Sequence, residues 1–144
     1  MERRHRDVES RPKVMVVDTT VWGDYFNGFE GPHAGRLERA LADEEDVAVL
    51  PLIIAEVLQG FRTETGFATA RDLLVDLPAI FPPLESYIEA ARLHRRLRKE
   101  GITVRGTIDC IIAQTCLEHD AELLSRDTDF DPIAERTGLR LWRA

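Results

Sequence analysis

The sequence predicts a three-layer α/β/α protein with a central, mostly parallel sheet of about five strands. Short apolar or β-branched runs alternate with longer segments of helical periodicity, the pattern of parallel strands joined by helical crossovers. The chain has 144 residues, of which 44% are hydrophobic and 31% charged, enough for one globular domain with its own core. We expect that domain to cover residues 13–144 and residues 1–12 to be a polar extension outside it.

The individual elements follow from periodicity and from turn residues. Val14–Val17 is a β-branched run that predicts a buried strand, and the helix after it should end near Gly28. Pro32 suits the first turn of a second helix, which a stripe of apolar residues extends to Asp43. Further strands are expected at residues 47–50, 79–81, 122–125 and 139–142, and further helices at residues 51–60, 64–77, 84–100 and 107–119, with a short helix before Gly138.

Composition and cysteine spacing exclude several classes of protein. The longest nearly apolar stretch, residues 47–58, is interrupted by Pro51 and Glu56 and is far shorter than the ~20 residues of a membrane span. The charged N-terminus shows no secretory signal. Cys110 and Cys116 fall on different faces of one predicted helix, so we expect free thiols and a cytoplasmic protein without membrane contact.

Four carboxylates stand beside segments that must be buried. Asp18 directly follows the first strand, and Asp127 follows the strand predicted at residues 122–125. Glu56 and Asp109 each interrupt an apolar segment of helical character. An isolated buried carboxylate must take up a proton or find a cation. Because parallel strands end at one edge of a sheet, we expect the four acids to converge there.

Each acid also has a purely structural interpretation. Asp18 could cap the next helix, Asp109 could favour a helix N-terminus, and Asp127 could form an Asx turn. Glu56 could pair with a buried arginine. Four such acids near one edge favour a divalent cation instead, because like charges within a few ångströms repel each other.

The residue types around the acids select the cation. Carboxylate oxygens without His or Cys partners suit Mg²⁺, with Mn²⁺ as a substitute. The histidines and cysteines lack zinc-site spacing, and the run from Asp127 to Asp131 fails as a calcium loop because Pro132 stands where glycine is needed. Carboxylate-held Mg²⁺ suits phosphodiester hydrolysis, since it lowers the pKa of a water and neutralises charge on the phosphate. No motif of a nucleophilic Ser or Cys is present.

Charge is segregated along the chain, whose net value is −7. Residues 92–105 contain one acidic and six basic residues, a local charge of +5. The six residues of this basic strip are Arg92, Arg95, Arg96, Arg98, Lys99 and Arg105. A basic strip beside an acidic cluster fits a metal site that handles a polyanion, and a solvated helix face is the alternative.

The order of these motifs resembles that of the PIN-domain ribonucleases, and specifically the VapC toxins of bacterial toxin–antitoxin pairs. The matching stretches are Val16–Trp22, Ile54–Gly60, Gly106–Ala113 and Leu123–Phe130, within a resemblance that spans about residues 14–142. It implies a PIN-like fold, in which the catalytic and metal-binding acids are Asp18, Glu56, Asp109 and Asp127. Thr20 matches a hydroxyl residue that helps to order the site, and Asp129 matches an additional acid.

The resemblance further implies an Mg²⁺- or Mn²⁺-dependent endoribonuclease that cuts structured RNA, typically tRNA or rRNA. It implies a VapB-like antitoxin that blocks the acidic pocket, with DNA contacted only through that antitoxin. A homodimer is expected, and the apolar faces of the helices predicted at residues 64–77 and 84–100 are the candidate surfaces. The basic strip would then contact RNA phosphates, with Arg36, Arg39 or Arg62 as competing candidates.

Three other interpretations share parts of this pattern. A phospho-receiver signalling domain also has an acidic Mg²⁺ pocket, but it needs a lysine late in the fold, and Lys13 and Lys99 are not placed for that. A phosphatase of the haloacid-dehalogenase type needs an Asp where this chain has Thr20. A catalytically inactive PIN scaffold that binds protein or RNA is the main alternative, and the presence of all four acids argues against it.

Overall fold

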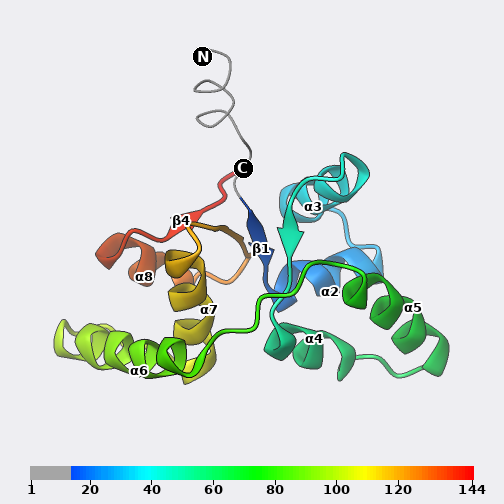
Figure 1. Cartoon of the computed structure of the whole chain (residues 1–144). Helices are drawn as coiled ribbons and strands as arrows, with labels where there is room; N and C mark the ends of the chain where they lie inside the picture. Colours follow the sequence, from blue (N-terminus) through cyan, green and yellow to red (C-terminus); the bar gives the residue numbers. More distant parts are fainter. Residues whose placement is uncertain (1–13) are drawn as a thin grey trace, which may run out of the picture.

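A parallel four-stranded sheet forms the centre of the computed structural model, which describes residues 14–144 (Figure 1). The strands are β1 (Met15–Val17), β2 (Val47–Ala48), β3 (Glu122–Leu124) and β4 (Arg140–Leu141), in the spatial order β2–β1–β3–β4. Every pairing between them is parallel, because a helical segment returns the chain to the same end of the sheet each time. The predicted extension of residues 1–12 lies outside the described residues.

Seven helices cover the two faces of the sheet within the described part of the chain. They are α2 (Thr19–Asn27), α3 (Pro32–Ala42), α4 (Pro51–Leu58), α5 (Glu64–Val75), α6 (Leu84–Lys99), α7 (Thr107–Glu118) and α8 (Phe130–Arg136). In Figure 1, α2 to α5 lie on one side of β1, and α6 to α8 lie on the other. The predicted three-layer α/β fold is therefore confirmed.

The strand predicted at residues 79–81 is the one element that the structure corrects. It is reduced to a single parallel bridge between Val49 and Ala79, with backbone hydrogen bonds from Val49 N–H to Pro78 O (3.0 Å) and from Ile80 N–H to Val49 O (2.8 Å). Prolines at positions 78, 82 and 83 lack the N–H group that a longer ladder would use. The sheet of residues 14–144 therefore has four strands instead of about five.

The core explains why such short strands are stable. All three residues of β1 are buried, and Trp22 and Phe130 pack from helices on opposite sides of the sheet with almost no exposed surface. Cys110 and Cys116 are buried and unpaired, as expected. Within residues 14–144, no helix has both the length and the apolar character needed to cross a membrane.

Helix ends fall where the sequence places them. The side chain of Asp18 caps α2 by accepting a hydrogen bond from Thr20 N–H, and Thr63 caps α5 in the same way. The first of these helices ends at Gly28, whose φ of 73° is a left-handed conformation that glycine adopts without strain. Because Asp18 both ends β1 and starts α2, its position is fixed from two directions.

Candidate active site

The candidate site lies where β1 and β3 end side by side. Val17 pairs with Leu124, and the Asp18 N–H extends this ladder by donating to the Leu124 carbonyl at 3.0 Å. The carboxyl end of β1 points towards α2 and α4 in Figure 1. The parallel pairing thus brings the residue after β1 to the loop after β3, as expected from the topology.

Asp18 lies at the centre of a hydrogen-bonded network and is only 5% exposed. Its Oδ1 accepts hydrogen bonds from Thr20 N–H (3.1 Å) and Thr20 Oγ1 (2.5 Å), and its Oδ2 accepts one from Ser125 Oγ (2.8 Å). Burial raises the pKa of Asp18, and these three hydrogen bonds offset part of that effect. The capping interpretation of Asp18 is therefore correct, and it is compatible with a place in the acidic site.

Two hydroxyl groups connect Asp18 to the loop after β3. Thr20 Oγ1 accepts a hydrogen bond from Arg126 N–H at 3.1 Å, and Ser125 Oγ accepts one from Asp127 N–H at 2.9 Å. The sequence analysis singled out Thr20 but not Ser125. The available signal was the position of Ser125 at the end of a predicted strand, two residues before a candidate acid.

Glu56 approaches from α4, next to α2. Its Oε1 accepts a hydrogen bond from Thr19 Oγ1 at 2.8 Å, and its side chain is partly buried. The alternative that Glu56 pairs with a buried arginine is wrong, because its recorded partner in residues 14–144 is this threonine hydroxyl. Thr19 is a second contact that sequence reasoning missed.

Asp109, Asp127 and Asp129 form the tightest part of the site. Each offers one oxygen atom, and these three atoms lie within 4.8 Å of one another. Asp109 is in the first turn of α7, where the helix dipole also favours an anion. Asp127 Oδ1 accepts a hydrogen bond from Asp129 N–H at 2.9 Å, so the predicted Asx turn is present as well. Sequence reasoning placed Asp129 in a supporting position, whereas the structure places it inside this cluster.

The pKa of Asp109 reflects the proximity of the other four acids. Its pKa is raised to about 6, first by burial and then by the negative charges of Asp127, Asp129, Asp18 and Glu56, in that order. Repulsion from four other carboxylates favours either a protonated Asp109 or a cation that the acids share.

The donor set suits a hard divalent cation. The three atoms of the cluster are carboxylate oxygens, and no His or Cys belongs to it within the described range of residues. Oxygen donors of this kind suit hard divalent ions, which take a few carboxylates and keep some of their waters. The crowding at Asp109 is the feature that a bound cation would relieve.

Comparison with known proteins agrees with this geometry. The family model described as PIN domain matches residues 15–136. The chain is also 32% identical, over 129 residues, to ribonuclease VapC11 of Mycobacterium tuberculosis, a match that covers 88% of this chain and 96% of that protein. The chain is a PIN-domain protein of the VapC family.

Solved structures share the same PIN-domain fold. VapBC2 from Rickettsia felis, crystallised with a DNA fragment from its promoter, matches with a TM-score of 0.72 at 18% identity, over 90% of this chain and 97% of that one. VapC20 of M. tuberculosis, a toxin that cleaves the sarcin–ricin loop, matches with a TM-score of 0.65 at 13% identity, over 83% and 94%. Because the PIN-domain model matches residues 15–136, the phospho-receiver and haloacid-dehalogenase interpretations are wrong.

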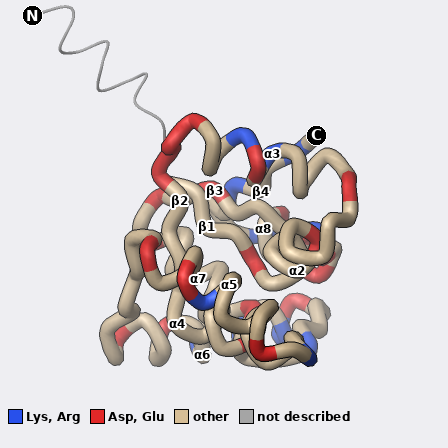
Figure 2. Tube along the Cα trace, turned by 90° about the vertical axis from the view of Figure 1, so that its right-hand side faces the viewer, with Lys and Arg blue, Asp and Glu red and all other residues tan. Residues whose placement is uncertain are grey.

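The basic strip of this PIN domain is only partly close to the acids. Arg105 lies 3.8 Å from Asp129 and is highly exposed. On α6, Arg92 pairs with Glu89, and Arg96 pairs with Glu100 and donates to the Arg136 carbonyl. Arg95, Arg98 and Lys99 are exposed and have no ion-pair partner among residues 14–144. Figure 2 shows acidic segments spread over much of the trace. Glu89 and Glu100, which pair with Arg92 and Arg96, reduce the local excess of positive charge.

Proposed function

We propose that this chain is the toxin of a VapBC-type toxin–antitoxin pair and acts in the cytoplasm as an Mg²⁺-dependent endoribonuclease, with Mn²⁺ as a substitute. Its substrate would be structured RNA, either tRNA or rRNA. The observation that carries the proposal is the convergence of four other carboxylates on Asp109, with one oxygen each of Asp109, Asp127 and Asp129 within 4.8 Å of one another. The ribonuclease names of relatives that match almost their whole length support the same conclusion.

Each acid has a proposed role in this reaction. Asp109, Asp127 and Asp129 would hold the cation together with Asp18 and Glu56. When bound, the cation would lower the pKa of a water and neutralise charge on the scissile phosphate. Thr20 and Ser125 hold Asp18 by hydrogen bonds, and Thr19 holds Glu56 Oε1. The other oxygen of Glu56 could then accept a proton from the attacking water.

Water is the proposed nucleophile because no side chain in the site suits that role. The hydroxyl groups of Thr20 and Ser125 both donate to Asp18 and both accept a backbone N–H group, so they are committed to ordering the site. Burial raises the pKa of Cys110 to about 11 and that of Cys116 to about 12, so neither supplies a thiolate at neutral pH.

The proposed partners are a VapB-like antitoxin and a second copy of the chain, with DNA bound only through the antitoxin. Similar folds crystallised as VapBC complexes support the first. An exposed apolar patch at the start of α6, with Phe81 and Leu84 each about three-quarters exposed and Ile88 nearby, supports the second. Light scattering should give a dimer mass for the wild type and a monomer mass for Phe81→Asp with Leu84→Asp; equal masses would refute this surface.

The basic strip is proposed to bind RNA phosphates, with Arg105 nearest the acids. Replacing Arg95 and Arg98 by glutamate should weaken RNA binding and flatten its dependence on salt, because each lost phosphate contact lowers the slope by roughly 0.7–0.9. The same change at Arg39 and Arg62 is the matched comparison. A loss confined to that second pair would move the RNA path to the other side of the site.

The decisive experiment expresses the chain in bacteria with and without its neighbouring gene, and incubates the purified protein with total RNA and Mg²⁺. We expect growth arrest that the neighbouring gene relieves, and cleavage at a small number of positions. Asp18→Asn should cause neither effect while keeping the fold. A wild type that binds RNA without cleaving it would instead favour the inactive scaffold.

A further inference from the structure

A cavity of about 380 Å³ adjoins the acidic site on the other side of the 125–128 loop. Ser125 and Asp127 line it and also belong to the acidic site, so the two spaces share a wall. Its opposite wall is built by His33 of α3, Leu141 of β4 and Trp142, which follows β4. The volume is at the lower end of the roughly 300–1,000 Å³ of small-ligand sites.

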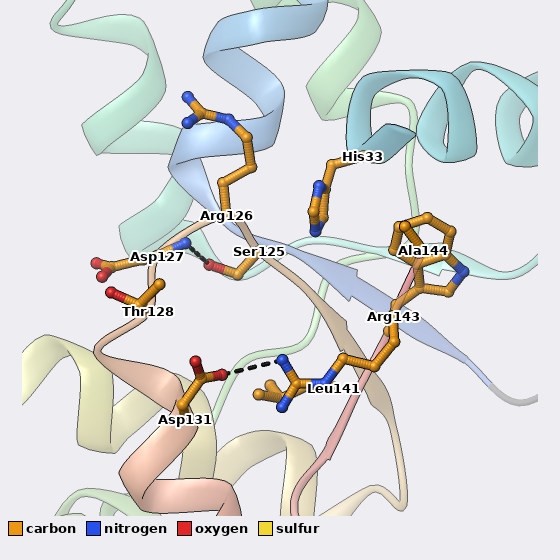
Figure 3. Close-up of a pocket in the computed structure, with 10 residues that line it drawn as sticks. His33, Ser125, Arg126, Asp127, Thr128, Asp131, Leu141, Arg143 and Ala144 are labelled. Carbon is orange, nitrogen blue, oxygen red and sulfur yellow. Dashed lines mark hydrogen bonds and ion pairs between the residues drawn. The ribbon is translucent and has the colours of Figure 1, made fainter. Parts of the chain in front are cut away.

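The wall formed by α3 and the end of the chain is aromatic. The rings of His33 and Trp142 meet edge to face, with centroids 5.1 Å apart and an interplanar angle of 74°. Both side chains are only partly buried, so their ring surfaces remain available to a ligand. Figure 3 shows His33 reaching from its helix into the space that Ser125 borders, while Asp127 points away from it.

Each of the two arginines that line the cavity is paired with a carboxylate. Arg126 is held by two hydrogen bonds to Asp24, and Arg143 donates to Asp131 at 3.1 Å, a contact that is drawn in Figure 3. Burial and the charge of Arg126 lower the pKa of His33, which favours the neutral imidazole with one donor and one acceptor. A cavity with paired charges, ring faces and neutral polar edges suits a planar heteroaromatic ligand better than a free anion.

We propose that this cavity binds one unpaired nucleobase of the RNA, from a nucleotide next to the scissile phosphate, by stacking it against Trp142 and His33. The proposal rests on the proposed nuclease function, since the shared residues Ser125 and Asp127 place the base beside the acids. Unstacked bases of single-stranded RNA are bound by aromatic side chains in this way, and polar groups at their edges give preference among bases. The cavity is thus a specificity subsite of the acidic site.

Tryptophan fluorescence tests the subsite independently of cleavage. The chain has two tryptophans, and Trp22 is fully buried, so quenching by an added nucleotide reports on Trp142. The probes are the four ribonucleoside 5′-monophosphates and a pentaribonucleotide of mixed sequence, added to Asp109→Asn protein in EDTA. We expect saturable quenching by at least one of them, none by inorganic phosphate, and loss of the signal in a Trp142→Phe background.

His33→Ala is the test variant and His119→Ala the matched control, because His119 is an exposed histidine at the far end of α7. His33→Ala should weaken pentaribonucleotide binding at least about five-fold, a modest share of the free energy of stacking one base. In the active protein it should raise KM by a similar factor with kcat within about two-fold, as for a residue that contributes only to binding. The control should change neither constant.

The two proposals fail in different ways. A wild type that cleaves RNA, but whose Trp142 is quenched by no nucleotide or equally by inorganic phosphate, overturns the subsite and leaves the nuclease intact. Unchanged binding and KM in His33→Ala also overturn it. Quenching by nucleotides in a wild type that cleaves no RNA supports the subsite and overturns the nuclease.

Discussion

The acidic site has two halves, one around Asp18 and one around Asp109, and the surroundings of the carboxylates differ between them. Asp18 is buried but accepts hydrogen bonds from Thr20 and Ser125 at both oxygens. Asp109 is less buried, yet its pKa reaches about 6, and after burial the causes are four neighbouring negative charges. Hydrogen-bond donors stabilise one half, whereas the other half is a concentration of unbalanced charge.

The difference indicates that the Asp18 half orders the site and that the Asp109 half is suited to bind a cation. The donors around Asp18 are neutral hydroxyl and amide groups, which fix its position but leave its negative charge in place. The cluster of Asp109, Asp127 and Asp129 has the exposed Arg105 guanidinium as a weak counterion at 3.8 Å. We call the surroundings of Asp18 the rigid half, because hydrogen bonds fix the position of its carboxylate. We call the cluster of Asp109, Asp127 and Asp129 the repulsive half, because its negative charges favour a divalent cation.

The largest effect is expected at Asp109. Asp109→Asn should lower the rate of RNA cleavage at least about 100-fold, because it removes a cation ligand from the centre of the cluster. Gel-based cleavage assays with Mg²⁺ and with Mn²⁺ measure this rate. Near wild-type cleavage by Asp109→Asn would show that the repulsive half is not the catalytic one.

The same substitution should stabilise the metal-free protein, and the effect should depend on pH. The pKa of Asp109 is raised from its ordinary value of 3.8 to about 6, so ionisation of Asp109 destabilises the folded state as the pH rises from about 4 through about 6. Because the side chain is partly exposed, solvent screening keeps this loss of stability below the roughly 3 kcal/mol of an unscreened shift. In EDTA, Asp109→Asn should unfold at a higher temperature than the wild type at pH 8, and this gap should be clearly smaller at pH 5, where only part of the penalty has developed. An equal gap at both pH values would contradict the electrostatic explanation.

Removing the hydroxyl of Ser125 tests the rigid half. Ser125→Ala leaves Asp18 Oδ2 and Asp127 N–H without their shared partner, and should reduce cleavage by roughly 10- to 100-fold and stability by about 1–2 kcal/mol. Ser125→Thr keeps the hydroxyl and should retain most activity. If both variants behave alike, the loss comes from packing and not from the hydrogen bonds.

Divalent cations should stabilise the wild type through the repulsive half. Binding to the folded state alone raises stability by linkage, so millimolar Mg²⁺ should raise the melting temperature by a few degrees. Asp109→Asn should show little of this increase, whereas Ser125→Ala should keep part of it. A wild-type melting temperature that is indifferent to Mg²⁺ would argue against a preformed ion site.

The smallest effect is expected at Arg105. Arg105→Gln removes an exposed ion pair, so stability should change by less than about 0.5 kcal/mol. Mg²⁺ affinity, measured by the shift in melting temperature across a titration, should rise slightly because a competing positive charge is lost. A marked fall in affinity would mean that Arg105 positions Asp129 instead of competing for it.

Local sequence was sufficient for the fold class and for the candidate acids. Runs such as Val14–Val17 identify strands, and residues that follow them must lie at the carboxyl edge of a parallel sheet, wherever they are in the chain. Asp18 and Asp127 could be selected on this basis. The strand predicted at residues 79–81 is only a single bridge. The prolines around it allow an extended backbone but lack the N–H groups that a longer ladder requires.

Local sequence was not sufficient for the contacts that order the site. Ser125 and Asp18 are 107 positions apart, and their hydrogen bond depends on the register that pairs Val17 with Leu124. Two arginines of the basic strip pair with Glu89 and Glu100 one helical turn away, whereas the hydrogen bond from Arg96 to the Arg136 carbonyl spans 40 positions. Pattern alone cannot measure such distances.

By itself, the sequence determined which residue types stand at the strand ends, and hence that negative charge would gather at one edge of the sheet. Only the tertiary structure decided that Asp129 joins Asp109 and Asp127, that Ser125 bridges Asp18 and Asp127, and that an aromatic cavity adjoins them. The physical reason is the distance along the chain over which each property acts. Burial and periodicity are properties of short segments, whereas a hydrogen bond or a charge cluster requires atoms from distant segments to be placed within a few ångströms by packing.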